Sequence, residues 1–413
     1  MVRFSPTGPV FPVRAHPPAQ RPVARAVIED LGFRAPEPIE EARLLGSLLP
    51  ETGPPPPDAK LPAAVIARNP LVSYSGISRH ARLGLASLVG DRLAGREAWF
   101  LLSPTWSIES REAAEDLRAR AVGHRHLEPR HRLVFVCNTL EEEAEMRAVG
   151  EAAIFYNKTA NVSEAVFRPL PGEPRVFDAV YNAQLVAWKR HELALAIPSC
   201  AFIFYRDSHG AGGPGVEAEI IARHGAIPGH VFLNTFREDG APRRFSPQEV
   251  NRELNLAHVG LCLSASEGAM FASVEYLLSG LPVVTTPSSG GRHVYHDPEF
   301  SLTVPADARA VAEAVAALKA RDIPREHVRA RTLKLIEYDR ARFMALLNTI
   351  LDAAGARRLT TDWPFRKPVT MEWLPVEEAV KRAADGVVDA FARKSRRLLR
   401  WRRRLTALLR KRT

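Results

Sequence analysis

From about residue 62 the chain alternates between short apolar runs and stretches in which apolar residues recur at helical spacing. In the first series the apolar runs predicted to be strands are 63–67, 98–102, 133–137 and 153–156. Between them helical spacing predicts helices over 77–93, 111–121 and 140–149, and residues 69–76 are expected to form a loop. This alternation indicates a parallel sheet with helices on both faces.

A second series of the same kind follows the polar, proline-containing segment 157–170, which we expect to link the two. Its predicted strands are 178–181, 201–205, 231–234, 259–263 and 283–285. Its predicted helices are 189–195, 216–224, 247–254, one that follows residue 268, 308–319 and 324–354. Two doubly wound α/β domains side by side bind ligands between their strand ends, so we expect a ligand cleft there.

The two ends of the chain do not share this alternation. Residues 1–60 are rich in proline and are expected to form an extension with little core of its own. We therefore divide the chain into this extension, a first doubly wound domain over 61–168, a second over 169–350, a helical segment over 351–392 and a tail over 393–413.

The tail carries all of the chain's excess positive charge. It holds eleven Lys and Arg and no acid, whereas the whole chain has a formal net charge of +10. Residues 1–392 are thus nearly neutral and lack the excess of basic residues that general nucleic-acid binding requires. If the tail is helical, Leu398, Trp401, Leu405 and Leu408 share one face. Such a cationic helix suits an anionic membrane surface, and the alternatives are a solvated tail or one that binds any polyanion, including RNA.

Composition is that of a globular protein. The hydrophobic content is 46%, and no run approaches the ~18 consecutive apolar residues that a membrane span needs. The first residues lack the apolar run of a secretion signal. Three cysteines, an odd number, each lie in an apolar run and favour a reducing compartment; they are Cys137, Cys200 and Cys262. These features predict a cytoplasmic protein.

Two glutamates separated by seven residues stand out in the second series. Glu267 lies on the expected turn between strand 259–263 and a helix, and Glu275 lies within that helix. Backbone amides at a helix start are unpaired and carry the positive end of the helix dipole. An acid at the turn, the amides of residues 268–271 and a second acid suit a polyhydroxylated, phosphorylated ligand. Taken alone, either glutamate is also consistent with an ordinary solvated acid.

The block SEGAMFASVEYLLSGLPVVTT at 266–286 resembles the E-x7-E signature of retaining GT-B glycosyltransferases of the large family 4 (group 1). The resemblance extends to Gly280-Leu281-Pro282 and to a glycine pair at Gly290-Gly291, and it covers roughly residues 150–345. It implies a GT-B fold, in which two Rossmann-like domains face a cleft. Here they would be flanked by the proline-rich extension and the basic helical tail, and the chain would cross back to the first domain near Trp373.

The resemblance also implies roles for individual residues. Glu275 is implied to hold the ribose hydroxyls of a nucleotide, because a carboxylate accepts two hydrogen bonds from a cis-diol. Glu267 is implied to lie near the transferred sugar, and Lys189 lines up with a lysine that neutralises the donor diphosphate. The amides implied to carry the diphosphate are those of Gly268, Ala269, Met270 and Phe271.

The chain departs from the family at two points. Gln184 stands where the family has an arginine, and a departing diphosphate needs positive charge. We expect Arg190 or Arg292 to supply that charge, or else the protein is weakened or inactive. Gly290 and Gly291 would let the backbone approach a ligand, although a glycine pair by itself is usually just a turn. Arg292 stands close behind this pair, where the family often has an acid.

Four further residues are candidates from their positions. Ser75, Gly76 and Arg79 lie where the family carries a glycine-rich loop. They are candidates to contact the donor phosphates or the acceptor, and the alternative is that they form a capped helix start. Asn234, at a predicted strand end, is a candidate to approach the nucleotide base.

These observations predict a retaining, metal-independent, hexosyltransferase-like glycosyltransferase. No Asp-x-Asp pair occurs in the sequence, which removes the usual metal–diphosphate anchor of GT-A transferases. We expect no cofactor and no metal, a nucleotide-diphosphate sugar as donor, and an envelope glycan or lipid-linked saccharide as acceptor. We place the protein in the cytoplasm or, through 393–413, at the inner face of the cytoplasmic membrane. No specific nucleic acid is expected.

Three alternatives remain open. The first is a degenerate transferase-like protein that binds a glycan or nucleotide without turnover, which Gln184 motivates. The second is a membrane- or polyanion-docking protein whose main activity lies in the tail. The third is another GT-B enzyme, such as a nucleotide-sugar epimerase.

Overall fold

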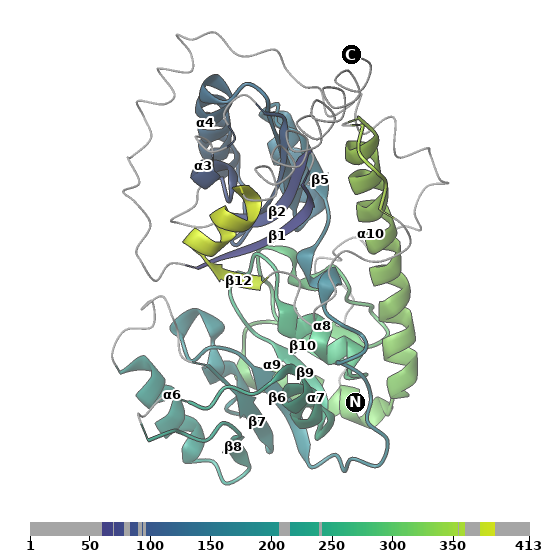
Figure 1. Cartoon of the computed structure of the whole chain (residues 1–413). Coiled ribbons are helices and arrows are strands. Elements are labelled where there is room, and N and C mark those ends of the chain that lie inside the picture. The colour runs from purple at the N-terminus through teal and green to yellow at the C-terminus, as the bar shows by residue number, and fades with distance from the viewer. Residues whose placement is uncertain are drawn as a thin grey trace, which may run out of the picture.

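The computed structural model describes residues 60–68, 70–77, 83–89, 93, 96–205, 215–238, 242–353, 355–359 and 372–384. The expected extension, apart from Lys60, and the basic tail lie outside the described residues, as does Arg79. Two six-stranded sheets, each flanked by helices, make up the described part (Figure 1). The predicted fold class of two doubly wound, Rossmann-like α/β domains is confirmed.

The first sheet has the strand order β12-β1-β2-β3-β4-β5. Its strands are β1 (Lys60–Arg68), β2 (Leu71–Ile77), β3 (Ala98–Pro104), β4 (His131–Cys137), β5 (Ala153–Phe155) and β12 (Glu372–Pro375). Strands β2 to β5 run parallel, whereas β1 is antiparallel to both of its neighbours. The helices described with this sheet are α3 (Ala86–Val89), α4 (Arg111–Leu127) and α5 (Leu140–Ala148).

The expectation of a loop over 69–76 is wrong, because residues 71–77 form β2. Every residue of this strand is buried, including Ser73 and Ser75. The serines interrupt the apolar pattern in the sequence. Their side chains are buried only because β2 lies between β1 and β3 in the folded sheet. The helix expected from residue 77 is also wrong at its start, since Ile77 is the last residue of β2.

The second sheet has the order β11-β10-β9-β6-β7-β8, and all of its strand pairs are parallel. Its strands are β6 (Phe177–Asn182), β7 (Cys200–Ile203), β8 (His230–Phe232), β9 (Ala257–Cys262), β10 (Val283–Thr285) and β11 (Ser301–Thr303). The α-helices of this half are α6 (Val216–Gly225), α7 (Pro247–Asn255), α8 (Phe271–Leu278), α9 (Ala308–Arg321) and α10 (Arg325–Ala353). The chain reverses its direction of travel across the sheet between β6 and β9. A ligand site is expected outside the carboxyl ends of these strands, at this topological switch point.

The helices begin where the sequence provides capping side chains. Ser110 and Thr139 accept hydrogen bonds from backbone amides of α4 and α5, and Asp307 does the same for α9. Ser246 and Glu249 form a reciprocal capping box at the start of α7. Each cap satisfies an amide that the helix itself leaves unpaired and so stabilises the first turn of its helix.

The helix expected over 189–195 is instead two short 3-10 turns, η3 (Ala187–Lys189) and η4 (His191–Ala194). Arg190 lies between them in the left-handed conformation with φ 51°. Strand β11 was not predicted. Within the segment expected to be helical over 351–392, the structure has β12 followed by helical residues 376–384.

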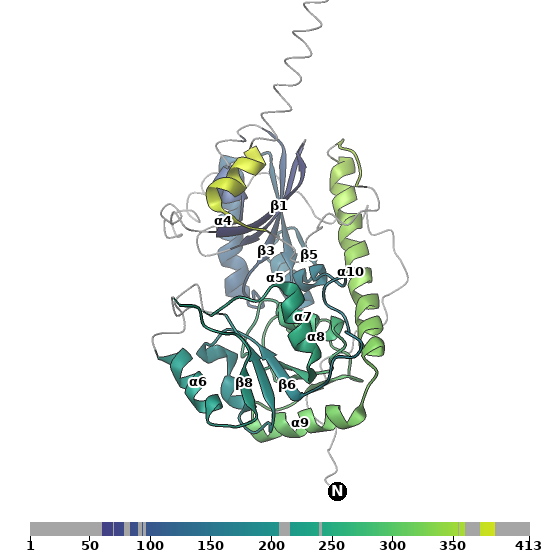
Figure 2. The same ribbon diagram turned by 60° about the horizontal axis from the view of Figure 1, so that its bottom comes forward.

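The two domains are joined by the C-terminal elements. Helix α10 runs alongside both domains in both views (Figure 1 and Figure 2). Its Phe343 stacks on Tyr156 with ring centroids 4.2 Å apart and contacts Tyr74 of β2 at 5.6 Å. Strand β12 then pairs with β1, so the chain does return to the first domain. Among the helices that the structure describes, none is both long and apolar enough to cross a membrane.

Candidate functional site

The residues singled out in the sequence gather at the carboxyl ends of three adjacent parallel strands. Lys189 follows β6, Glu267 follows β9, and Gly290 follows β10. Parallel strands place their carboxyl ends at one edge of the sheet, so segments far apart in the sequence meet there. This edge faces the first domain, because the amide of Gly290 donates a hydrogen bond of 3.1 Å to Oε2 of Glu109.

Lys189 and Glu267 form an ion pair between Nζ and Oε1. Their side chains are only 10% and 13% exposed. The backbone carbonyl of Lys189 accepts a 2.6 Å hydrogen bond from the hydroxyl of Tyr181, which anchors η3 to β6. A cation and a carboxylate, both largely shielded from water, are therefore held together at the switch point.

Glu275 lies in α8, beside the end of β6. Its Oε2 accepts a 3.1 Å hydrogen bond from Nδ2 of Asn182. Burial raises the pKa of Glu275 to about 7, and the hydrogen bond from Asn182 only partly offsets this rise. The next residue, Tyr276, accepts a hydrogen bond of 2.6 Å from the amide of Asn182 at its hydroxyl. Two successive residues of α8 thus bind the end of β6.

The raised pKa gives a prediction for stability. The pKa of Glu275 is higher in the folded state than its ordinary value of 4.5, so folding favours the protonated carboxyl. The contribution of Glu275 to the free energy of unfolding therefore falls as the pH rises from about 4.5 to about 7. Glu275→Gln is neutral at every pH and keeps an oxygen that accepts from Asn182. We expect the melting temperature of wild type to fall more than that of the variant between pH 5 and pH 8. Parallel pH profiles would argue against a buried, proton-binding Glu275.

Arg190 and Arg292 bind backbone oxygens at the ends of β9 and β10. Arg190 donates from Nε to the carbonyl of Leu263 at 2.6 Å and from Nη2 to that of Ser264 at 2.9 Å. Arg292, which is 2% exposed, donates from Nη1 to the same Ser264 carbonyl at 2.6 Å and from Nη2 to the carbonyl of Thr286. Burial lowers the pKa of Arg292. In this structure both guanidinium groups hold the strand ends together. Gln184, at the arginine position of the family, lies half-buried in the loop after β6.

The glycines bring backbone against backbone. A Cβ on Gly268 would lie 2.8 Å from the carbonyl oxygen of Thr105 in the first domain. Asn157 of the first domain donates from Nδ2 to the carbonyl of Gly291 at 2.8 Å. Gly290 has a φ of 86° and an extended ψ of −178°, a backbone conformation that essentially only glycine adopts. The close approach that we expected toward a ligand is, at Gly291, an approach to Asn138 and Asn157 of the first domain and, at Gly290, an approach to the backbone of Glu267 in the same domain.

The start of α8 has no side-chain cap. Met270 occupies the cap position and makes no side-chain hydrogen bond to the helix. No capping side chain therefore competes with a diphosphate for the backbone amides at the start of α8. Ala269 and Phe271 are half-buried, whereas Gly268 and Met270 are buried.

Lys158 was missed in the sequence. It lies in the short 3-10 helix η2 (Lys158–Asn161), and its Nζ donates to the carbonyl of Pro104. Burial lowers its pKa to about 8, and the charges of Glu142 and Glu267 oppose this change. The segment 157–170 looked like a polar linker, and nothing in its pattern indicated a buried cation. Only the docking of the two domains brings Lys158 toward Glu267.

The remaining candidates have structural partners. Oδ1 of Asn234 accepts from the amide of Phe204 at 2.8 Å, and its Nδ2 donates to the carbonyl of Arg243 at 2.8 Å. Ser75 is buried in β2, where its Oγ accepts from the amide of Leu85 at 3.0 Å. A Cβ on Gly76 would lie 2.6 Å from Cγ of Pro62. Among the described residues, no group of three or more His, Cys, Asp or Glu side chains is placed to hold a metal ion.

No protein-family model matches the sequence, and a comparison with curated protein sequences finds no match. Solved structures resemble it at low identity. Anabaena HepE in complex with UDP is 13% identical over 66% of this chain and 77% of its own, with a TM-score of 0.47. Sucrose-phosphate synthase from Thermosynechococcus elongatus is 18% identical over 62% of this chain and 65% of its own, with a TM-score of 0.40. The pneumococcal O-GlcNAc transferase GtfA, in complex with UDP and GlcNAc, is 13% identical over 62% and 52%, with a TM-score of 0.42.

Proposed function

We propose that this protein is a retaining glycosyltransferase of the GT-B type, similar to family 4, that uses a nucleotide-diphosphate sugar as donor. The observation that carries the proposal is the shielded pair of Lys189 and Glu267 at the switch point of a Rossmann-like sheet. Such a site offers a cation for a diphosphate and a carboxylate for sugar hydroxyls at neighbouring positions. Glu275, within α8 and beside β6, is available for the cis-diol of a ribose.

In the proposed reaction, an acceptor hydroxyl oxygen forms a bond to the anomeric carbon while the bond from that carbon to the diphosphate oxygen breaks. The departing diphosphate takes up the proton of the acceptor hydroxyl, so no protein nucleophile or base is needed. Lys189 and the amides of Gly268 to Phe271 stabilise the negative charge that develops on the leaving group. Glu267 orients the sugar, and binding between the two domains excludes water.

Several finer features belong to the same proposal. The chemistry needs no metal and no cofactor, because cations and amides stabilise the leaving group. The first domain binds the acceptor, an envelope glycan or lipid-linked saccharide. The protein acts in the cytoplasm, and its basic tail at 393–413 holds it to the inner face of the cytoplasmic membrane.

A thermal-shift panel tests the donor site. UDP, GDP, ADP and their common sugar conjugates are applied to wild type, to Glu275→Ala and to Glu313→Ala as the control. Glu313 is a matched acid on α9, paired with Arg309 and 53% exposed at its side chain. At 100 times its dissociation constant a ligand stabilises by about 2.7 kcal/mol. We expect one nucleotide to stabilise wild type and the control but not Glu275→Ala. If no nucleotide shifts the wild type, the transferase proposal fails.

One observation favours a second candidate, a transferase-like protein that binds a donor without turnover. Gln184 replaces a cation, and the guanidinium groups of Arg190 and Arg292 are occupied by backbone carbonyls. Release of free nucleotide from the donor in the presence of acceptor saccharides separates the two candidates. Turnover supports the enzyme, and stoichiometric binding without release supports the binding protein.

A further inference from the structure

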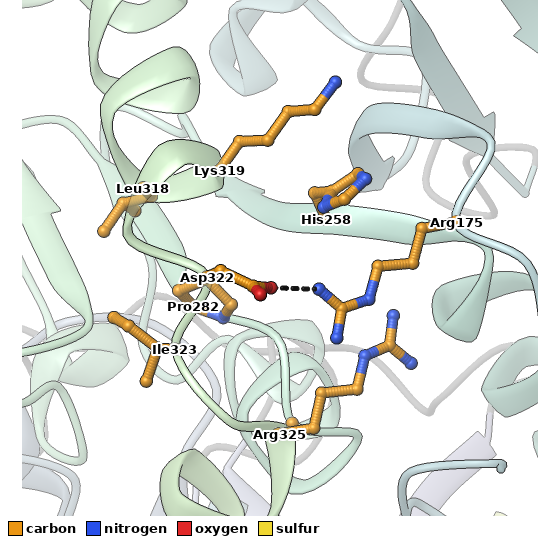
Figure 3. A pocket seen from close by; sticks show the side chains of 9 residues that line it. Arg175, His258, Pro282, Leu318, Lys319, Asp322, Ile323 and Arg325 are labelled. Atoms are coloured by element: carbon orange, nitrogen blue, oxygen red, sulfur yellow. Dashed lines mark hydrogen bonds and ion pairs between the residues drawn. The ribbon is translucent and has the colours of Figure 1, made fainter.

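A polar depression lies at the opposite edge of the second sheet from Glu267. Its wall includes Pro282, directly before β10, and His258 near the start of β9. Arg175, just before β6, and Arg325, the first residue of α10, project into it (Figure 3). Because β6, β9 and β10 are parallel, their amino ends lie at the far edge of the sheet from the carboxyl ends that carry Lys189 and Glu267. The depression is therefore separate from the proposed donor site.

Basic side chains predominate in its wall. Three positively charged residues line it, namely Arg175, Lys319 and Arg325, against one acid, Asp322; His258 also lines it, but burial lowers the pKa of its imidazole. Asp322 accepts one hydrogen bond of 3.2 Å from Nη1 of Arg175 and is 82% exposed at its side chain. Lys319 pairs with Asp178, 2.5 Å away, which does not line the depression. The acids near this wall thus offset only part of its positive charge.

The charge of Arg325 faces uncharged groups. Its Nη1 donates to Oδ1 of Asn255 at 2.6 Å, and its Nη2 donates to the carbonyls of Asn255 and Ala257 at 2.9 Å each. Burial lowers the pKa of Arg325 to about 10, and the neighbouring charge of Arg175 lowers it further in the same direction. The side chains of Arg175 and Arg325 both line the depression in Figure 3, and their like charges repel one another.

The backbone is built around Arg325. Gly280 has a φ of 79°, and a Cβ at this position would lie 2.5 Å from Cβ of Arg325. Asp322 is also left-handed, with a φ of 41°, at the turn that ends α9. Any larger residue at position 280 would push Arg325 away, so the conformations of these two turns hold the basic wall in place.

We propose that this depression binds the phosphate group of a small soluble ligand, either inorganic phosphate or a phosphate monoester. The cavity volume of about 10 Å³ admits one water-sized group, so one phosphate oxygen enters while the others stay at the mouth. Arg175 binds the outer oxygens, and Arg325 supplies charge from beneath. A dianion between the two guanidinium groups replaces their repulsion by attraction. Planar guanidinium groups match phosphate oxygens in geometry as well as in charge.

The test is isothermal titration of the full chain with inorganic phosphate in a chloride buffer. The informative variant is Arg175→Gln, and the control is Arg309→Gln, which removes an arginine from exposed surface of α9. The basic tail is present in all three proteins, so any binding to it cancels in the comparison. Arg175 is part of one exposed ion pair, and such pairs contribute little to stability, so both variants are expected to fold.

We expect saturable binding to wild type and to the control, and binding weakened about tenfold in Arg175→Gln, the size expected from losing a charge-assisted hydrogen bond. Saturating UDP should leave phosphate binding unchanged, which separates this site from the proposed donor site. A parallel titration with methyl phosphate distinguishes the two sources, since equal binding indicates a monoester and loss of binding indicates the free ion. Absence of saturable binding, equal affinity in Arg175→Gln, or displacement of phosphate by UDP would each overturn the proposal.

Discussion

Replacing Lys189 by methionine is expected to lower donor turnover by about 10²–10³-fold, the effect of removing one group that stabilises developing charge. Lys189 is the cation that pairs with Glu267, whereas Arg190 and Arg292 at this edge bind backbone carbonyls. Methionine keeps the length and apolar stem of the side chain, so the main change is the loss of charge. Initial rates of nucleotide release, measured across donor concentrations, check this prediction.

Two further variants make the prediction specific. Lys334→Met on α10 removes an exposed lysine far along the chain and should leave the rate unchanged. Lys189→Met also leaves Glu267 with a mostly buried charge and no ion-pair partner, which costs on the order of 3–5 kcal/mol for a fully buried pair. Adding Glu267→Gln should therefore recover stability but not turnover. A rate within a few-fold of wild type in Lys189→Met would remove this lysine from the mechanism.

Gly290→Ala is expected to destabilise the protein by on the order of 4 kcal/mol, a cost reserved for severe steric or backbone conflicts. A Cβ at this position would lie 1.3 Å from the carbonyl oxygen of Glu267, and the φ of 86° with extended ψ is a conformation of glycine. Relief of that overlap must move Gly290 or Glu267, and so it also displaces the carboxylate from Lys189. Melting temperature and nucleotide binding should fall together.

Gly172→Ala is the matched control for this prediction. Gly172 has nearly the same φ, 87°, but a Cβ there would meet no atom within 4 Å. Only the backbone preference is lost, which costs about 1–2 kcal/mol. If both variants lose the same stability, the contact between Gly290 and Glu267 is not the cause.

The alternation of apolar runs with helical spacing predicted most elements of both domains. Strand β10 occurs as predicted, and α8 follows Glu267 with its apolar face in the core. Such elements can be predicted from the sequence because the local spacing of apolar residues indicates which side of each helix or strand is buried. Strand β2 was missed for the converse reason. Its serines are polar, and only the packing of β1 and β3 on either side makes a buried strand of them.

The spacing of Glu267 and Glu275 identified the candidate site, but it did not show what each charge contacts. The sequence by itself determined the two α/β series and the residues at the strand ends. Only the tertiary structure decided that Lys189 pairs with Glu267, that Arg190 and Arg292 hold the strand ends, and that Lys158 approaches from the first domain. Electrostatic partners depend on distances between segments far apart in the chain, and burial sets the strength of each charge. For Lys189, Arg190 and Arg292 both quantities depend on the folding of the second domain, and for Lys158 they depend also on the docking of the two domains.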